Sequence, residues 1–309
     1  SADGTGDWNI FDTMRGLTVD ADGTTDRVLY ANESNAEESR NYFKIKANGF
    51  QVTSSTVSSS SSNYIYVAIR RGPLATPTSA SDVFTIDTLG STGDGSEPGF
   101  RSSFVVDWAL QKNLIGSGEN WELVTRQMQG CSLRPNSSNA IDTGEGGEQF
   151  DYQNGFNTNT STNGNAYAWM WKRAPSFCDV VNYEGDGGSA RTVPHNLEVV
   201  PEMIWIKKLN SGNWIVYNKD IGNDKYIVLN EALFPVSSST YFSNTTPSAT
   251  TFTVGTNTLV NENGSRYQAI LFSTLAGVSK VGTYSGDGTT NGSNVVDCGF
   301  SNGAKFILI

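Results

Sequence analysis

The chain reads Tyr183-Glu184-Gly185-Asp186-Gly187-Gly188, and further on it reaches Trp214 in Gly212-Asn213-Trp214-Ile215-Val216-Tyr217. The same two landmarks recur upstream at almost the same spacing, as Gly93-Asp94-Gly95 and then Trp121. A third Gly-Asp-Gly stands at 286–288, and a comparable tryptophan, Trp8, stands near the other end of the sequence. The pattern predicts three repeats of about a hundred residues, one of them split between the two ends.

An aromatic strand is the next landmark after each of these tryptophans. The three predicted strands begin at Tyr64, Tyr167 and Tyr267, and an earlier strand start carries Phe50, Phe156 or Phe252. The segments between landmarks are broken throughout by Gly, Asn and Ser, and no amphipathic segment of ten or more residues predicts a helix. Short strands at regular spacing predict an all-β fold of tandem antiparallel modules, each resembling a β-sandwich or jelly roll.

The landmarks also predict module boundaries. Residues 83–175 and 176–276 read as complete modules, 1–82 as the C-terminal part of a module, and 277–309 as the N-terminal part of one. The split is in register: if Ile309 were joined to Ser1, it would stand as far before Trp8 as Ile206 stands before Trp214.

Three explanations of the split stay open. The chain is an excerpt of a longer array, or its ends close into a ring, or 277–309 completes the 1–82 part of a neighbouring chain by strand addition. The first explanation needs the fewest assumptions and is preferred, and ring closure and strand addition are kept as hypotheses.

Composition bounds the function. Charged residues make up 17% of the 309, and the net charge is −10 with a pI near 4.6. No basic face is visible, which argues against nucleic-acid binding, and no apolar run reaches the roughly 18 residues needed to span a bilayer. The three cysteines, Cys131, Cys178 and Cys298, lie at non-equivalent places without zinc or disulfide spacing and are interpreted as small buried hydrophobes.

Titratable residues offer little catalytic chemistry. His195, the single histidine, sits in Val-Pro-His-Asn-Leu, and the other modules lack a histidine there, so a structural turn is favoured over a triad or general base. The turn residues Asp94, Asp186 and Asp287 are weak metal candidates, because no copy carries the spaced carboxylates of a calcium loop and Asp-Gly also suits a tight turn.

Two further sets of residues have competing interpretations. Paired carboxylates of a glycoside hydrolase could be drawn from Asp142, Glu145 and Glu148, although any chain with 31 acidic residues offers such pairs. Trp169, Trp171 and Trp205 are weak candidates for sugar stacking, and core or module-interface packing is the alternative. Core packing is the favoured interpretation of Trp8, Trp121 and Trp214, and the acidic cluster Glu33, Glu37 and Glu38 is interpreted as a solvated loop.

The intact module from Phe177 to Phe272 resembles a repeated β-domain of tail fibre and appendage proteins of tailed bacteriophages, notably marine ones. Residues 64–71 and 278–288 carry the same resemblance. It implies a virion location outside the cell, a structural or host-attachment role, and partners among other virion proteins or host glycans. It also implies self-association, with a trimer expected for fibres, and brings no catalytic residue or cofactor.

We therefore expect a non-enzymatic structural protein that acts as a spacer or a host-surface attachment platform. The alternatives are a secreted carbohydrate-binding or filament-forming β-protein and, less favoured, a polysaccharide depolymerase.

Overall fold

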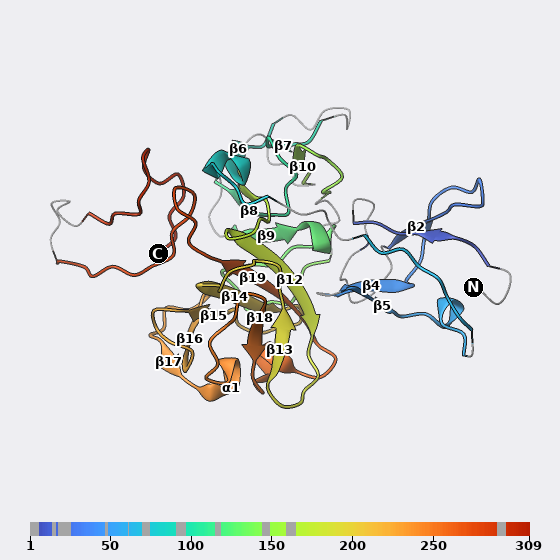
Figure 1. Ribbon diagram of the computed structural model, residues 1–309. Helices are drawn as coiled ribbons and strands as arrows, with labels where there is room; N and C mark the ends of the chain where they lie inside the picture. Colours follow the sequence, from blue (N-terminus) through green and yellow to red (C-terminus); the bar gives the residue numbers. More distant parts are fainter. Residues whose placement is uncertain are drawn as a thin grey trace.

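The computed structural model describes residues 6–13, 17, 26–46, 49–60, 62–69, 75–90, 97–114, 119–143, 149–158, 165–288 and 295–309. The all-β prediction is confirmed, because the described chain is built from short antiparallel strands and a few helical turns. Figure 1 shows a central body formed by the described residues between 75 and 276. The N-terminal residues lie on one side of this body and the C-terminal residues on the opposite side.

A six-stranded antiparallel sheet forms the largest layer of the body. Its strand order is β12-β19-β14-β15-β16-β17. The strands are β12 (Cys178–Glu184), β14 (Met203–Lys208), β15 (Ile215–Asn218), β16 (Lys225–Val228), β17 (Val236–Ser237) and β19 (Arg266–Phe272). Strand β19 has β12 on one side and β14 on the other.

Both faces of this sheet are buried along β12, β19, β14 and β15, which explains the near-continuous apolar sequences of these strands. On β14, Ile204 and Ile206 face one core, and Trp205 between them faces another, as the two-residue period of a strand requires. The first core is covered by β13 (Arg191–Pro194) paired with β18 (Thr251–Val254), and by α1 (Ser239–Phe242) and α2 (Thr258–Asn261).

Residues 83–171 form a second unit with the same strand order. Its sheet runs β6-β11-β8-β9, which corresponds to β12-β19-β14-β15, and the pair β7-β10 corresponds to β13-β18. The strands are β6 (Phe84–Thr88), β7 (Phe100–Arg101), β8 (Trp108–Asn113), β9 (Glu122–Thr125), β10 (Gly155–Phe156) and β11 (Ala166–Trp171). Short 3-10 turns lie at Ala80–Asp82 and Arg126–Met128. The two units therefore share one strand topology.

The two sheets pack against each other through their remaining faces. The shared core contains Trp108, Trp171, Trp205 and Ile270 together with Trp214. The Trp108 and Trp171 rings are stacked, with centroids 4.0 Å apart and planes 4° apart, and Trp205 meets Trp108 edge-on at 6.5 Å. Dense aromatic packing of this kind leaves no solvent layer between the two units.

The N-terminal region repeats the far edge of the six-stranded sheet. This region contains β1 (Asn9–Ile10), β2 (Arg27–Tyr30) and β3 (Glu38–Ser39), and β2 pairs with β1 and with β3. The residue-to-residue registers are the same as those by which β16 pairs with β15 and with β17. A hairpin of β4 (Phe43–Lys46) and β5 (Gly49–Val52) follows, and then a 3-10 turn at Ser55–Val57. Trp8 is 58% exposed, so the core-packing prediction is wrong for this residue, because the N-terminal strands carry no opposing sheet among the described residues.

A hydrogen-bonded asparagine identifies the three copies independently of strand order. The backbone N–H of Trp8, Trp121 and Trp214 donates to the side-chain oxygen of Asn32, Asn136 and Asn230, at 2.8, 3.2 and 2.8 Å. Each asparagine amide then donates to the side chain of the residue before the tryptophan: Asp7, Asn120 or Asn213. We call this arrangement the Trp–Asn bracket.

One predicted strand is absent from the part of the chain that the structure describes. Residues 64–69 belong to no described β-ladder. The strand prediction for this segment is wrong for the described chain, because a strand requires a hydrogen-bonded neighbour, and none lies beside it among the described residues.

Candidate functional site

An open pocket of about 340 Å³ lies at the start of β14 and the end of β15 in the 176–276 unit. Its walls come from four places in the chain: residues 200–202 before β14, Tyr217 at the end of β15, the turn at 219–223, and Thr246 after α1. The volume is within the range of sites for small ligands, which begins near 300 Å³.

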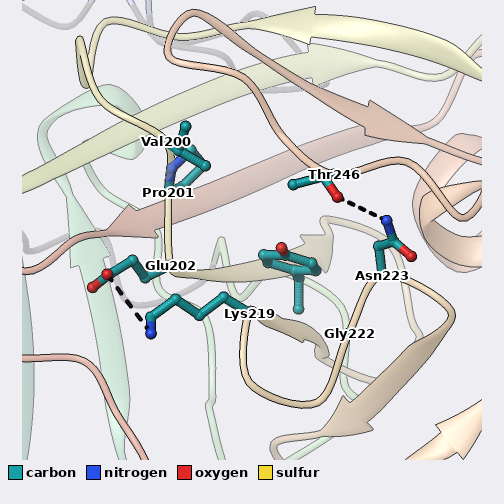
Figure 2. Close-up of a pocket in the computed structure, with 8 residues that line it drawn as sticks. Val200, Pro201, Glu202, Lys219, Gly222, Asn223 and Thr246 are labelled. Atoms are coloured by element: carbon teal, nitrogen blue, oxygen red, sulfur yellow. Dashed lines mark hydrogen bonds and ion pairs between the residues drawn. The ribbon is translucent and has the colours of Figure 1, made fainter.

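Polar side chains stand on two sides of this pocket. Figure 2 shows Glu202 beside Lys219, and Asn223 joined to Thr246. The Glu202 carboxylate is 3.9 Å from Lys219 Nζ, and Asn223 Nδ2 donates to Thr246 Oγ1 at 2.9 Å. Glu202 is also held from behind, since its Oε2 accepts from the backbone N–H of Thr274 at 2.8 Å. The pocket lining therefore holds an anionic carboxylate and a cationic ammonium on one side, and an amide and a hydroxyl on the other.

The electrostatics of the pocket keep Lys219 charged. Its ammonium donates to Asp220 at 2.9 Å, and this hydrogen bond raises the pKa of Lys219. Burial raises the pKa of Tyr217, and the nearby Asp220 adds to the effect. A phenol, an ammonium, a carboxylate and an amide therefore give the pocket lining both hydrogen-bond donors and acceptors.

The three tryptophans singled out for sugar stacking lie in or beside the shared core. Trp171 and Trp205 are 5% and 3% exposed, so protein covers their rings. Trp169 is half-buried and packs against Trp121 at 5.2 Å between centroids. Their positions favour the interpretation that they pack in the core or at the module interface. None of the three lines the pocket at the start of β14 and the end of β15.

The aspartates considered as metal ligands differ in their surroundings. Asp186 Oδ1 accepts from the backbone of Gly188 and from Asn261, both at 2.9 Å, and these bonds lower the pKa of its carboxyl. Asp287 is exposed, and Asp94 lies outside the described residues. Within the described ranges, no group of three His, Cys, Asp or Glu side chains could hold a metal ion.

His195 is buried in a turn, with both ring nitrogens in hydrogen bonds. Nδ1 accepts from the backbone N–H of Leu197 at 3.2 Å, so the proton belongs on Nε2, which faces the Ser248 carbonyl at 3.2 Å. Burial lowers the pKa of His195, which keeps the ring neutral. The geometry gives His195 a structural part in closing this turn.

The carboxylate candidates do not form a described pair. Asp142 is held in an ion pair with Arg134 at 2.7 Å, and Glu145 and Glu148 lie outside the described residues. Among the N-terminal acids, Glu33 is exposed, and repulsion from Asp7 is the main cause that raises the pKa of its carboxyl. Cys131 and Cys178 are buried, as predicted, whereas Cys298 is partly exposed.

A buried ion cluster joins the two units beside the shared core. Arg173 Nε lies 3.2 Å from Asp107 in one unit, and Arg173 Nη1 lies 3.7 Å from Asp179 in the other. Both carboxylates are buried, and Asp179 also accepts from the backbone N–H of Asn196 at 2.8 Å. Paired and hydrogen-bonded in this way, the charges fix the relative position of the two sheets.

Comparisons with known proteins place the chain in a family without identifying its activity. A family model described as a domain of unknown function, DUF7483, matches residues 1–73 and 86–309. No curated protein and no solved structure matches the chain. In the described part of the chain, no helix is long and apolar enough to cross a membrane. Because the family model matches almost the whole sequence, the chain belongs to the DUF7483 family.

Proposed function

We propose that the chain is a structural segment of a phage tail fibre or similar virion appendage, in which it serves as a stiff spacer and a platform for attachment to the host surface. The supporting observation is the face-to-face packing of the two sheets. A spacer that transmits force needs units that do not hinge, and inter-domain motion is the default unless an interface is large and apolar.

Three kinds of contact support stiffness. The aromatic core lies between the sheets, and the Asp107–Arg173–Asp179 cluster bridges them. Backbone hydrogen bonds also cross the junction, from Ile141 to the Leu209 carbonyl at 2.7 Å and from Gly212 to the Ser138 carbonyl at 2.8 Å. On this proposal the chain carries out no reaction.

The location is tested on particles. Antibodies raised against residues 75–276 should label tails or surface fibres of purified virions in immunogold electron microscopy, and peptides of the chain should be found in those virions by mass spectrometry. Peptides found only in the soluble fraction of the host culture, with unlabelled particles, would contradict a virion role and favour a secreted protein.

A host glycan is the ligand that we propose for the pocket at β14 and β15. Glycan arrays test this, and the Asn223→Ala and Lys219→Ala variants should lose the signal because they remove a donor or the cation at the rim. Lys225→Ala, on the neighbouring strand and outside the pocket lining, is the matched control. Retention of the signal in both pocket variants would move the glycan site elsewhere.

A further inference from the structure

Three basic side chains meet where the hairpin of β4 and β5 contacts the central body. Lys44 and Lys46 lie on β4, and Arg266 is the first residue of β19. All three line a small cavity together with Asn182 of β12, whose amide is buried. We call these three residues the cation cluster. Positive charge is therefore concentrated at one place in a chain whose net charge is −10.

A single carboxylate is paired within the cation cluster. Glu184 lies opposite Arg266 in the β12–β19 ladder, and its Oε2 accepts a hydrogen bond from Lys46 Nζ at 2.7 Å. Because Glu184 balances only one of the three cations, the cluster keeps an excess of positive charge that attracts anions.

Lys44 has no anionic partner in the part of the chain that the structure describes. No described carboxylate lies within ion-pair distance of its ammonium, and no described residue accepts a hydrogen bond from it. The side chain is half-buried, and burial lowers the pKa of Lys44, an effect to which repulsion from Arg266 adds. An ammonium that has lost part of its hydration is stabilised when it gains a charged acceptor.

The cavity beside Lys44 has the size of one small group. Its volume is about 10 Å³, which is the space that one water molecule or one oxygen atom of a larger anion occupies. A tetrahedral oxyanion can place one oxygen there and keep its other oxygens in solvent. The planar guanidinium of Arg266 suits such a group, because its donors match the oxygens of phosphate in pairs.

The other unit shows that the fold does not require charges at this end of the strands. By strand register, Gly90 corresponds to Glu184, and Asn165 corresponds to Arg266. The same strand pairing therefore forms with two uncharged residues. The cation cluster is particular to one of the two units, which favours a role in binding over a role in folding.

We propose that the cation cluster binds a sulfate or phosphate group, and that the bound group holds the hairpin of β4 and β5 against the ends of β12 and β19. The group is either a free ion or a substituent of an acidic polysaccharide. The site adjoins Leu209 after the end of β14, whereas the pocket described above lies at the start of β14. The inference therefore does not depend on the glycan proposed for that pocket.

NMR titration with sodium sulfate, at an ionic strength held constant with sodium chloride, tests the site. In wild type, the amide resonances of β4 and Arg266 should shift and saturate. Lys44→Gln should weaken the affinity about tenfold or more, because it removes a charge-assisted hydrogen bond. Lys44→Arg keeps the charge and should bind nearly as wild type. Lys225→Gln, the same loss of charge on β16 and outside the cavity lining, is the matched control.

A variant with the opposite effect keeps the test decisive if Lys44→Gln folds poorly. Glu184→Gln removes the carboxylate that competes with the anion, so it should bind sulfate more tightly than wild type, a gain that unfolding does not produce. Equal affinities in wild type, Lys44→Gln and Glu184→Gln would overturn the proposal. Shifts no larger with sulfate than with chloride would overturn it too, because they would report screening alone.

Hydrogen exchange tests whether the bound group holds the hairpin in place. Sulfate should slow the exchange of the β4 and β5 amides in wild type and leave it unchanged in Lys44→Gln. Exchange that sulfate leaves unchanged in wild type would overturn this part of the proposal.

Chromatography on immobilised dextran sulfate distinguishes the two sources of the oxyanion. Retention of wild type on dextran sulfate but not on dextran, with earlier elution of Lys44→Gln, would support a polysaccharide substituent. Saturable binding of the free ion without retention would support an inorganic ion at the same site. Absence of both would overturn the site.

Discussion

Replacing Trp171 with alanine should be one of the most damaging single changes in the body. Its ring is 5% exposed, lies 4.0 Å from Trp108 and 5.0 Å from Phe84, and contacts Phe306 at 5.2 Å. Truncation of a buried tryptophan costs about 3–5 kcal/mol. Each lost aromatic pair accounts for about 0.5–1.5 kcal/mol beyond area burial, so we expect about 4 kcal/mol for Trp171→Ala.

Urea denaturation followed by tryptophan fluorescence and by circular dichroism measures this loss. Trp171→Phe preserves an aromatic ring and should cost less than half as much. Trp8→Ala removes an equally large ring that is 58% exposed, and should change the free energy of unfolding by less than about 0.5 kcal/mol.

The result also tests the packing of the two sheets. Because both units share this core, fluorescence and circular dichroism should report one transition in the wild type. A loss below about 1 kcal/mol in Trp171→Ala would refute the reasoning, since it would mean that the ring is not enclosed between the sheets. The residue would then regain its alternative interpretation as an exposed binding surface.

Three other outcomes are expected. Burial lowers the pKa of His195, so the unfolded chain takes up this proton first, and the free energy of unfolding should fall as pH drops below 6.5; NMR of the single imidazole, which should titrate below 6.5, checks the cause. Lys207 is fully buried, and burial lowers its pKa to about 8. Between pH 8 and pH 10.5 the folded chain has lost this proton while the unfolded chain still binds it, so the free energy of unfolding should increase by up to about 3 kcal/mol over that range. Thermal melts of wild type and Lys207→Met should show this increase in wild type alone. In the turn, Gly185→Ala should cost about 1–3 kcal/mol in a urea titration, because a Cβ there would collide with the Glu262 carbonyl, whereas Gly188→Ala, which would meet only the Asp186 side chain, should cost less.

Local sequence was sufficient for the class of the fold. Alternating apolar residues and Gly-rich turns predict strands because their periodicity is a property of the strand itself. The repeat of Gly-Asp-Gly and tryptophan also predicted the correspondence between Trp121 and Trp214, which the Trp–Asn bracket and the strand registers show independently. The bracket itself was missed, because Asn32, Asn136 and Asn230 do not follow their tryptophans at one fixed spacing.

Long-range packing decided the rest. Trp214 is buried and Trp8 exposed, although both occupy one position of the repeat, because only one of them has a second sheet against it. The pocket joins Glu202, Lys219 and Thr246, which are common residue types far apart in sequence. Residues 64–69 have strand propensity but no strand, since a β-strand is completed by its neighbours. The sequence by itself therefore determined which segments can pair, and the tertiary structure decided which of them do, because backbone pairing and burial depend on partners that the segment does not contain.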